Sequence, residues 1–208
     1  LYNSLISEAP NVTFVGSSTV NSGGIPIAGQ PHNGYASFAT LDLNGNLNGY
    51  DPYIFNLRGG TERDPQSGYW LAPSNGKDPN VILLLVGAID INEQGTRPDG
   101  GIGGGVVDPY QFQTNLTTLL DTITSLRPSA KVIVGENIPR GDSVATDAIV
   151  DDVINPAVNT VVSNFRAAGN TNISVVDLNT GFPADGLDSG GVHPSDSVYT
   201  WMATQWYN

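Results

Sequence analysis

The sequence contains no cysteine, which excludes disulfide bonds, a thiol nucleophile and a thiolate metal site. It also has no apolar run near the ~20 residues that a membrane-spanning helix needs. Basic side chains are scarce, with 8 Lys and Arg against 20 Asp and Glu, so the net charge is -12. Such a charge repels phosphate backbones and anionic lipid surfaces, and we therefore expect neither nucleic-acid nor membrane partners.

The composition that is present favours one extracellular domain. A chain of 208 residues can bury one core, and its length gives no reason to divide 1–208. Gly, Asn, Ser, Thr and Asp are abundant and only 13% of residues are charged, which is typical of long hydrogen-bonding loops and of secreted polysaccharide-processing proteins. The chain starts at Leu1 without a signal-peptide pattern, so we expect a mature or trimmed product. Glycan acceptor triplets begin at Asn11, Asn115 and Asn172.

Short apolar runs rich in β-branched residues predict the strands. Val81 to Val86, Lys131 to Val134 and Ile173 to Val176 are typical of strands buried on both faces, as in a parallel sheet covered by helices. Val12 to Val15 fits an outer strand of the same sheet. Amphipathic segments at 108–126, 148–168 and 197–207 predict helices between and after these strands.

The alternation of strands and helices predicts the fold class. It implies right-handed crossovers in a flavodoxin-like, three-layer α/β/α sandwich with a mainly parallel central sheet. Pro156 is expected to kink the second helical segment or to start a new helix. Ligands in such sheets bind at the carboxyl ends of the strands, so the loops there are the candidate site.

One histidine lies in such a loop. His193, within Asp188 to Asp196, directly precedes the last predicted helix, and an imidazole there suits general-base work because its pKa lies near neutrality. Its alternative role is to cap that helix. Together with 81–93 (VILLLVGAIDINE), this loop resembles the SGNH, or GDSL-type, hydrolases, in particular the acetylxylan esterases of carbohydrate esterase family three. Further segments that resemble the framework of that family are 1–17, 32–35, 127–134 and 201–203.

The resemblance implies a secreted serine hydrolase that removes acetyl groups from an acetylated polysaccharide or another neutral carbohydrate, without a cofactor or metal. His193 would be its general base. The family has an aspartate three residues before this histidine, where this sequence has Gly190, so Asp188 or Asp185 would have to substitute.

The oxyanion region also departs from the family pattern. Ser37 stands at the position of a glycine, but its backbone N–H can still donate. In the run that begins at Gly87, Ile89 replaces an asparagine whose amide donates to the oxyanion. Loss of one such donor typically costs about 10²- to 10³-fold in turnover. Two functions therefore stand side by side, a weak esterase and an inactive carbohydrate-binding or assembly module.

The nucleophile block of the family, a strand ending in Gly-Asp-Ser, would precede Leu1. In the strand order of the family it lies between Val12 to Val15 and Val81 to Val86, so its loss would leave a gap in the sheet. Each unpaired buried backbone group costs ~1–3 kcal/mol. We expect an N-terminal segment, a strand from another protomer, or a local segment such as Tyr53 to Leu57 to fill this gap.

Two serines in this sequence are alternative nucleophiles. Ser18 follows a predicted strand in Gly-Ser-Ser and would leave no gap, although the acid is missing from that turn. Ser143, in Gly-Asp-Ser, lies where the family has a variable loop and is a good helix-capping residue. The same stretch holds the adhesion-type tripeptide Arg140 to Asp142. A three-residue motif often occurs by chance, so the adhesion interpretation is weaker still. The acidic groups at 90–93 and 151–152 fit solvated surfaces better than a metal site.

Overall fold

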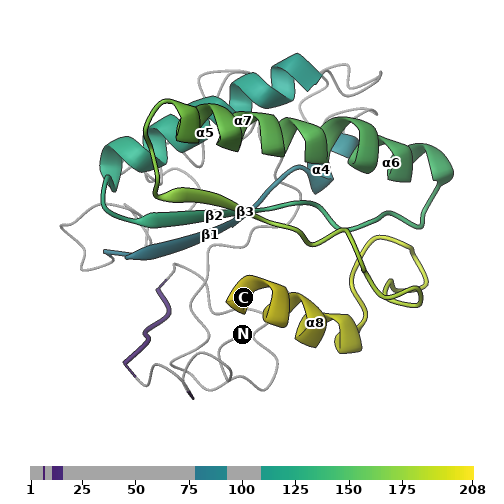
Figure 1. The fold of residues 1–208 in the computed structure, drawn as a ribbon. Helices are drawn as coiled ribbons and strands as arrows, with labels where there is room; N and C mark the ends of the chain where they lie inside the picture. The colour runs from purple at the N-terminus through teal and green to yellow at the C-terminus, as the bar shows by residue number, and fades with distance from the viewer. Residues whose placement is uncertain (1–6, 8–10, 16–77, 93–108) are drawn as a thin grey trace, which may run out of the picture.

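The computed structural model describes residues 7, 11–15, 78–92 and 109–208 (Figure 1). These residues form a parallel sheet in the order β1-β2-β3. Its strands are β1 (Val81–Leu85), β2 (Lys131–Gly135) and β3 (Ile173–Val176). The three strands predicted from the apolar runs are therefore confirmed, and so is their parallel pairing.

Helices cover both faces of the sheet, which confirms the predicted three-layer α/β/α sandwich (Figure 1). The helices α5 (Pro109–Leu126) and α7 (Asn155–Ala167) lie on one face, and α8 (Asp196–Tyr207) lies on the other. Shorter helices at the carboxyl edge of the sheet are α4 (Ala88–Asn92) and α6 (Val144–Ile149). None of the helices in the described ranges is both long and apolar enough to cross a membrane.

The main core lies between the sheet and the helices α5 and α7. Alternating residues Val132 and Val134 of β2 are fully buried there. They meet a helical stripe that repeats every three to four residues, which is the spacing that aligns side chains on one helix face. The stripe consists of Phe112, Leu116, Leu119, Leu120 and Ile123 of α5, with Val158, Val161 and Val162 of α7.

A second, smaller core lies under α8. Leu178, Val198 and Met202 are buried there, and Trp206 packs against them. Gly135 of β2 allows this close approach, because a Cβ at that position would lie 2.8 Å from the ring of Trp206.

Pro156 divides the second helical segment as predicted. A π-helical turn (Val150–Ile154) follows α6, and α7 then starts at Asn155 with Pro156 in its first turn. Proline is tolerated there because the first backbone N–H groups of a helix have no intrahelical acceptor.

The predicted outer strand Val12 to Val15 is wrong. Residues 11–15 form a turn followed by chain without strand pairing, and in Figure 1 the segment lies below the sheet. A β-branched run becomes a strand only beside a neighbour that pairs with its backbone. Within the described residues β1 pairs with β2 alone, so no such neighbour is present on its other side.

Candidate active site

The loop that carries His193 is a narrow hairpin between β3 and α8. Leu187 pairs with Pro194 in an isolated antiparallel bridge. The N–H of Asp188 donates to the carbonyl of His193 over 2.8 Å. Ser195 occupies the N-cap position of α8, so the helix does not begin at His193. The histidine is exposed, as a base that meets a substrate must be.

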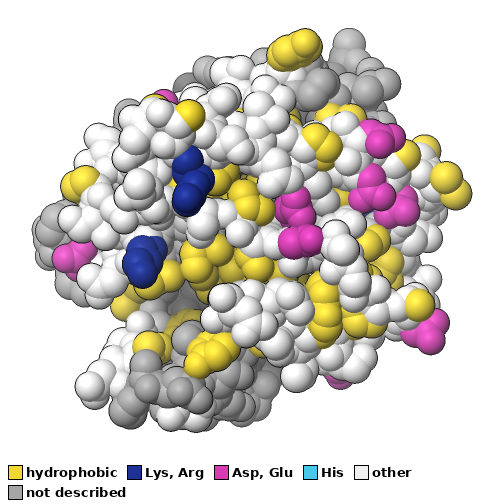
Figure 2. All heavy atoms as spheres, viewed as in Figure 1, with side chains coloured by type: hydrophobic (Ala, Val, Ile, Leu, Met, Phe, Trp, Pro, Cys, Tyr) yellow, Lys and Arg dark blue, Asp and Glu magenta, His cyan; other side chains and the backbone are white. Residues whose placement is uncertain are grey.

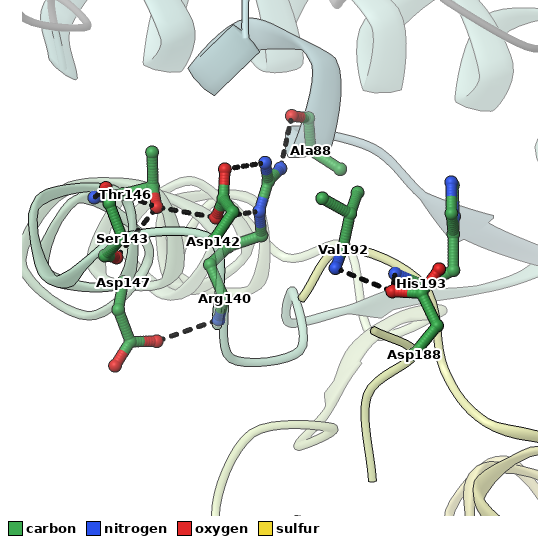
Figure 3. Close-up of polar contacts among 9 residues, drawn as sticks. All are labelled: Ala88, Arg140, Asp142, Ser143, Thr146, Asp147, Asp188, Val192 and His193. Atoms are coloured by element: carbon green, nitrogen blue, oxygen red, sulfur yellow. Dashed lines mark hydrogen bonds and ion pairs between the residues drawn. The ribbon is translucent and has the colours of Figure 1, made fainter. Parts of the chain in front are cut away.

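Asp188 supports the main chain of this hairpin. Its Oδ1 accepts the backbone N–H groups of Val192 over 3.1 Å and of His193 over 3.3 Å (Figure 3). These two bonds, followed by the charge of His193, lower the pKa of the Asp188 carboxyl. Asp188 therefore meets His193 through a backbone hydrogen bond, and its expected role as the acid that orients the imidazole stays a prediction. Among the described residues, neither Asp188 nor Asp185 hydrogen-bonds the imidazole.

The hairpin rests on the turn after β2. Gly141 donates its N–H to the carbonyl of Gly191 over 2.8 Å. Gly191 has a φ of 67°, and a Cβ on it would lie 2.4 Å from the carbonyl carbon of Gly141. Only glycine fits both the left-handed conformation and this close approach.

The Gly-Asp-Ser copy in that turn has a structural role. Ser143 is the N-cap of α6, and its hydroxyl accepts the N–H of Thr146 over 3.1 Å. In Figure 3 Ser143 and His193 lie on opposite sides of the Arg140 and Asp142 pair. The helix-capping interpretation is confirmed, and Ser143 is not placed to exchange a proton with His193.

Arg140 and Asp142 pair with each other. The guanidinium binds both carboxylate oxygens, with Nε at 3.0 Å from Oδ1 and Nη2 at 2.7 Å from Oδ2. Arg140 is only 5% exposed, so these two residues do not present an adhesion motif. The arginine is foremost among the causes that hold the pKa of Asp142 at about 2.

The segment after β1 is tied to the end of β2. Asn137 donates its side-chain amide to the carbonyl of Val86 over 2.8 Å. The backbone N–H of Asn137 donates to Oδ1 of Asn155. The side-chain amide of Asn155 in turn donates to the backbone carbonyl of Asn137. Gly87 has a φ of 118°, and a Cβ there would lie 2.8 Å from the Asn137 amide. Sequence reasoning missed Asn137, although its place shortly after the predicted strand Lys131 to Val134 was a signal.

The other predicted oxyanion residues are only partly described. Ile89 lies in α4, but its side chain is outside the described atoms. Ser37 and the alternative nucleophile Ser18 lie outside the described residues, as does the segment Tyr53 to Leu57.

Two carboxyl groups meet at the carboxyl ends of β2 and β3. Asp177 lies close enough to Glu136 to raise its pKa, and the amide of Asn159 donates to Glu136. Burial raises the pKa of Glu136, and the Asp177 charge adds to the rise. Burial opposes the lowering of the Asp177 pKa, but the N–H groups of Thr180 and Asn179 outweigh it. Beside Glu136 lies a pocket of about 230 Å³.

Acidic side chains, drawn in magenta, gather over one half of the face in Figure 2. Hydrophobic side chains show in the hollow between the α7 layer and α8 on the same face.

Across the described part of the chain, no three His, Cys, Asp or Glu side chains are grouped to hold a metal ion.

The glycan acceptor triplets differ in accessibility. Asn11 and Asn172 are exposed, whereas Asn115 is 3% exposed on the inner side of α5. A glycan on Asn115 is incompatible with this packing.

Comparison with known proteins agrees with the fold. A model of the GDSL-like lipase/acylhydrolase family matches residues 14–201. An acetyl esterase mutant with a bound acetate ion is 21% identical, with a TM-score of 0.70 over 98% of this chain and 84% of that one. A carbohydrate esterase family 3 protein from Talaromyces cellulolyticus is 22% identical, with a TM-score of 0.70 over 99% of this chain and 84% of that one.

A family 3 carbohydrate esterase from Clostridium thermocellum is 19% identical, with a TM-score of 0.66 over 99% of this chain and 80% of that one. No curated protein matches the sequence significantly. The solved structures establish a shared fold, and the family match covers most of the chain. This chain belongs to the GDSL-like lipase/acylhydrolase family.

Proposed function

We propose that this protein is an extracellular acyl esterase that acts on an acetylated polysaccharide, with His193 as its general base. The observation that carries the proposal is the position of His193. The histidine is exposed on a hairpin that two backbone hydrogen bonds to Asp188 hold in shape. Family membership supports ester hydrolysis, and the net charge of -12 favours a neutral substrate over a phosphorylated one.

The chemistry has two steps. A serine hydroxyl attacks the acetyl carbonyl while His193 accepts the proton, and His193 then returns that proton to the departing sugar oxygen. Water hydrolyses the acetyl-serine in the second step, again with His193 as base. Activity is low because Ile89 cannot donate to the oxyanion and Gly190 cannot orient the imidazole.

The serine, in this proposal, belongs to a strand that pairs with β1, supplied by an N-terminal segment or by another protomer. Val81, Leu83 and Leu85 are 52%, 39% and 46% exposed. Leu85 lies in register with Gly135, which contacts Trp206, so these three side chains face the α8 layer. Parallel sheets are normally buried on both faces, so this exposure supports a further segment that covers β1. Within the described residues β1 pairs with β2 alone, and this outer position supports a further strand beside it.

Hydrolysis of p-nitrophenyl acetate by the wild type and by His193→Ala tests the proposal. We expect the substitution to lower the rate by at least about 10²-fold, the usual share of general acid-base catalysis. Asp121→Ala is the matched control, because Asp121 is exposed on α5, away from the hairpin. If His193→Ala retains the wild-type rate, His193 is not the base.

The second candidate is an inactive module that binds carbohydrate. It is favoured by the position of Asp188, whose hydrogen bonds go to the backbone while the imidazole has no acidic partner among the described residues. Under this alternative the wild type binds acetylated xylan without releasing acetate. Titration calorimetry and acetate release on the same substrate separate the two functions.

A further inference from the structure

We propose that the ion pair of Arg140 and Asp142 is a positioning device that couples the segment after β1 to the His193 hairpin. The inference rests on the proposed function in so far as His193 is the base. The side chain of Arg140 hydrogen-bonds the segment after β1. The backbone of the next residue, Gly141, hydrogen-bonds the His193 hairpin.

The pair is rigid. The side chain of Arg140 is 3% exposed and that of Asp142 is 29% exposed. Two parallel hydrogen bonds fix the plane of the guanidinium against the carboxylate, a geometry that a lysine cannot reproduce. The hydroxyl of Thr146 donates to Asp142 over 2.7 Å, and Asp147 accepts the backbone N–H of Arg140 over 2.8 Å. The start of α6 therefore braces the pair from a second side.

The first arm reaches the segment after β1. Nη1 of Arg140 donates to the carbonyl of Ala88 over 3.4 Å (Figure 3). Ala88 is the first residue of α4 and follows Gly87, in the stretch where Ile89 stands at the position of the family's oxyanion asparagine. Arg140 thus holds the backbone at the start of α4.

The second arm reaches the histidine. Gly141 is bonded to Gly191, and the two backbones are in contact with no room for a Cβ on Gly191. Gly191 donates its N–H to the carbonyl of Asp188 over 2.9 Å, in the same hairpin that holds His193. A shift of the turn at Gly141 is therefore transmitted to His193 through direct backbone contacts. In this way the Arg140 and Asp142 pair sets the distance between the segment after β1 and His193.

Amide hydrogen exchange of the intact protein tests this coupling. In Arg140→Lys we expect exchange at Gly191, Val192 and His193 to rise by at least about tenfold, the change that loss of one hydrogen bond to a charged group produces. Exchange in α5 should stay unchanged. Arg166→Lys is the matched control, because Arg166 donates to the carbonyl of Ile173 over 2.9 Å at the opposite end of β3. It should leave the hairpin protected.

Asp142→Asn provides a milder variant if Arg140→Lys does not fold, since Asp142 is partly exposed and asparagine keeps its shape. Unchanged protection of the hairpin in both variants overturns the inference, and so does an equal rise in α5, which indicates general destabilisation. On acetyl esters, the coupling predicts a lower kcat with an unchanged KM. The exchange result decides the coupling whether or not esters are hydrolysed, and the His193→Ala assay decides the proposed function separately.

Discussion

Gly191→Ala offers a sharp test of how the His193 hairpin is held. The glycine has a φ of 67°, and an added Cβ would lie 2.4 Å from the carbonyl carbon of Gly141 and 2.5 Å from the backbone nitrogen of Asp142. The left-handed conformation alone costs a non-glycine residue about 1–2 kcal/mol. The overlap adds more, because it can be relieved only by parting the two backbones and losing the bond between them, worth about 1 kcal/mol.

The chain contains a matched control for the backbone strain. Gly181 has a φ of 75°, and a Cβ on it would meet nothing within 4 Å. Gly181→Ala should therefore show only the conformational cost, about 1–2 kcal/mol. Gly191→Ala should lose about 2–3 kcal/mol, or the hairpin should open to avoid that loss.

Thermal unfolding followed by circular dichroism measures the loss of global stability. Amide exchange at 188–193 measures opening of the hairpin. At about 2–4 °C per kcal/mol for a protein of this size, Gly191→Ala should melt roughly 4–12 °C below the wild type if the hairpin stays closed. Hairpin opening would instead appear as lost protection with a melting temperature closer to that of Gly181→Ala. Equal melting temperatures and equal exchange in the two variants would refute the reasoning, since the close approach to Gly141 would then carry no cost.

Two further predictions concern the sheet. Glu136 has a raised pKa, so ionisation of its carboxyl group lowers the free energy of unfolding. This loss of stability is absent below the unfolded pKa near 4.5, grows as the pH rises from there through the folded pKa, and is complete above the folded pKa. Glu136→Gln should therefore raise the free energy of unfolding at neutral pH, as measured by urea titration, and this gain should disappear below pH 4. A gain that does not depend on pH would contradict the prediction. Gly135→Ala should destabilise by about 1–3 kcal/mol through overlap with the Trp206 ring, and Trp206→Leu in the same chain should recover part of that loss; additive effects in the double mutant would exclude the contact.

The three strands of the described sheet could be predicted because their signal is local. Runs such as Val81 to Val86 are apolar on both faces, and this pattern has few alternatives in a chain that alternates strands with amphipathic helices. Val12 to Val15 has a similar composition but is not a strand, because strand formation depends on a paired neighbour that composition does not specify.

The candidate site shows the same division. The cap role of Ser143 followed from its place before a helical pattern, and the structure confirms it. The ion pair of Arg140 and Asp142 was missed, since three adjacent residues on a loop gave no indication that the arginine is buried or that it reaches Ala88, 52 residues earlier in the chain.

By itself, the sequence determined the layer architecture, the parallel strands and the loop that carries His193, because each depends on periodicity or on a contiguous motif. Only the tertiary structure decided which groups meet at the carboxyl edge of the sheet. The contacts of Asp188 with the hairpin backbone, of Gly141 with Gly191 and of Arg140 with Ala88 depend on how loops pack in space. Such packing follows from the whole core and not from the residues on either side of each loop.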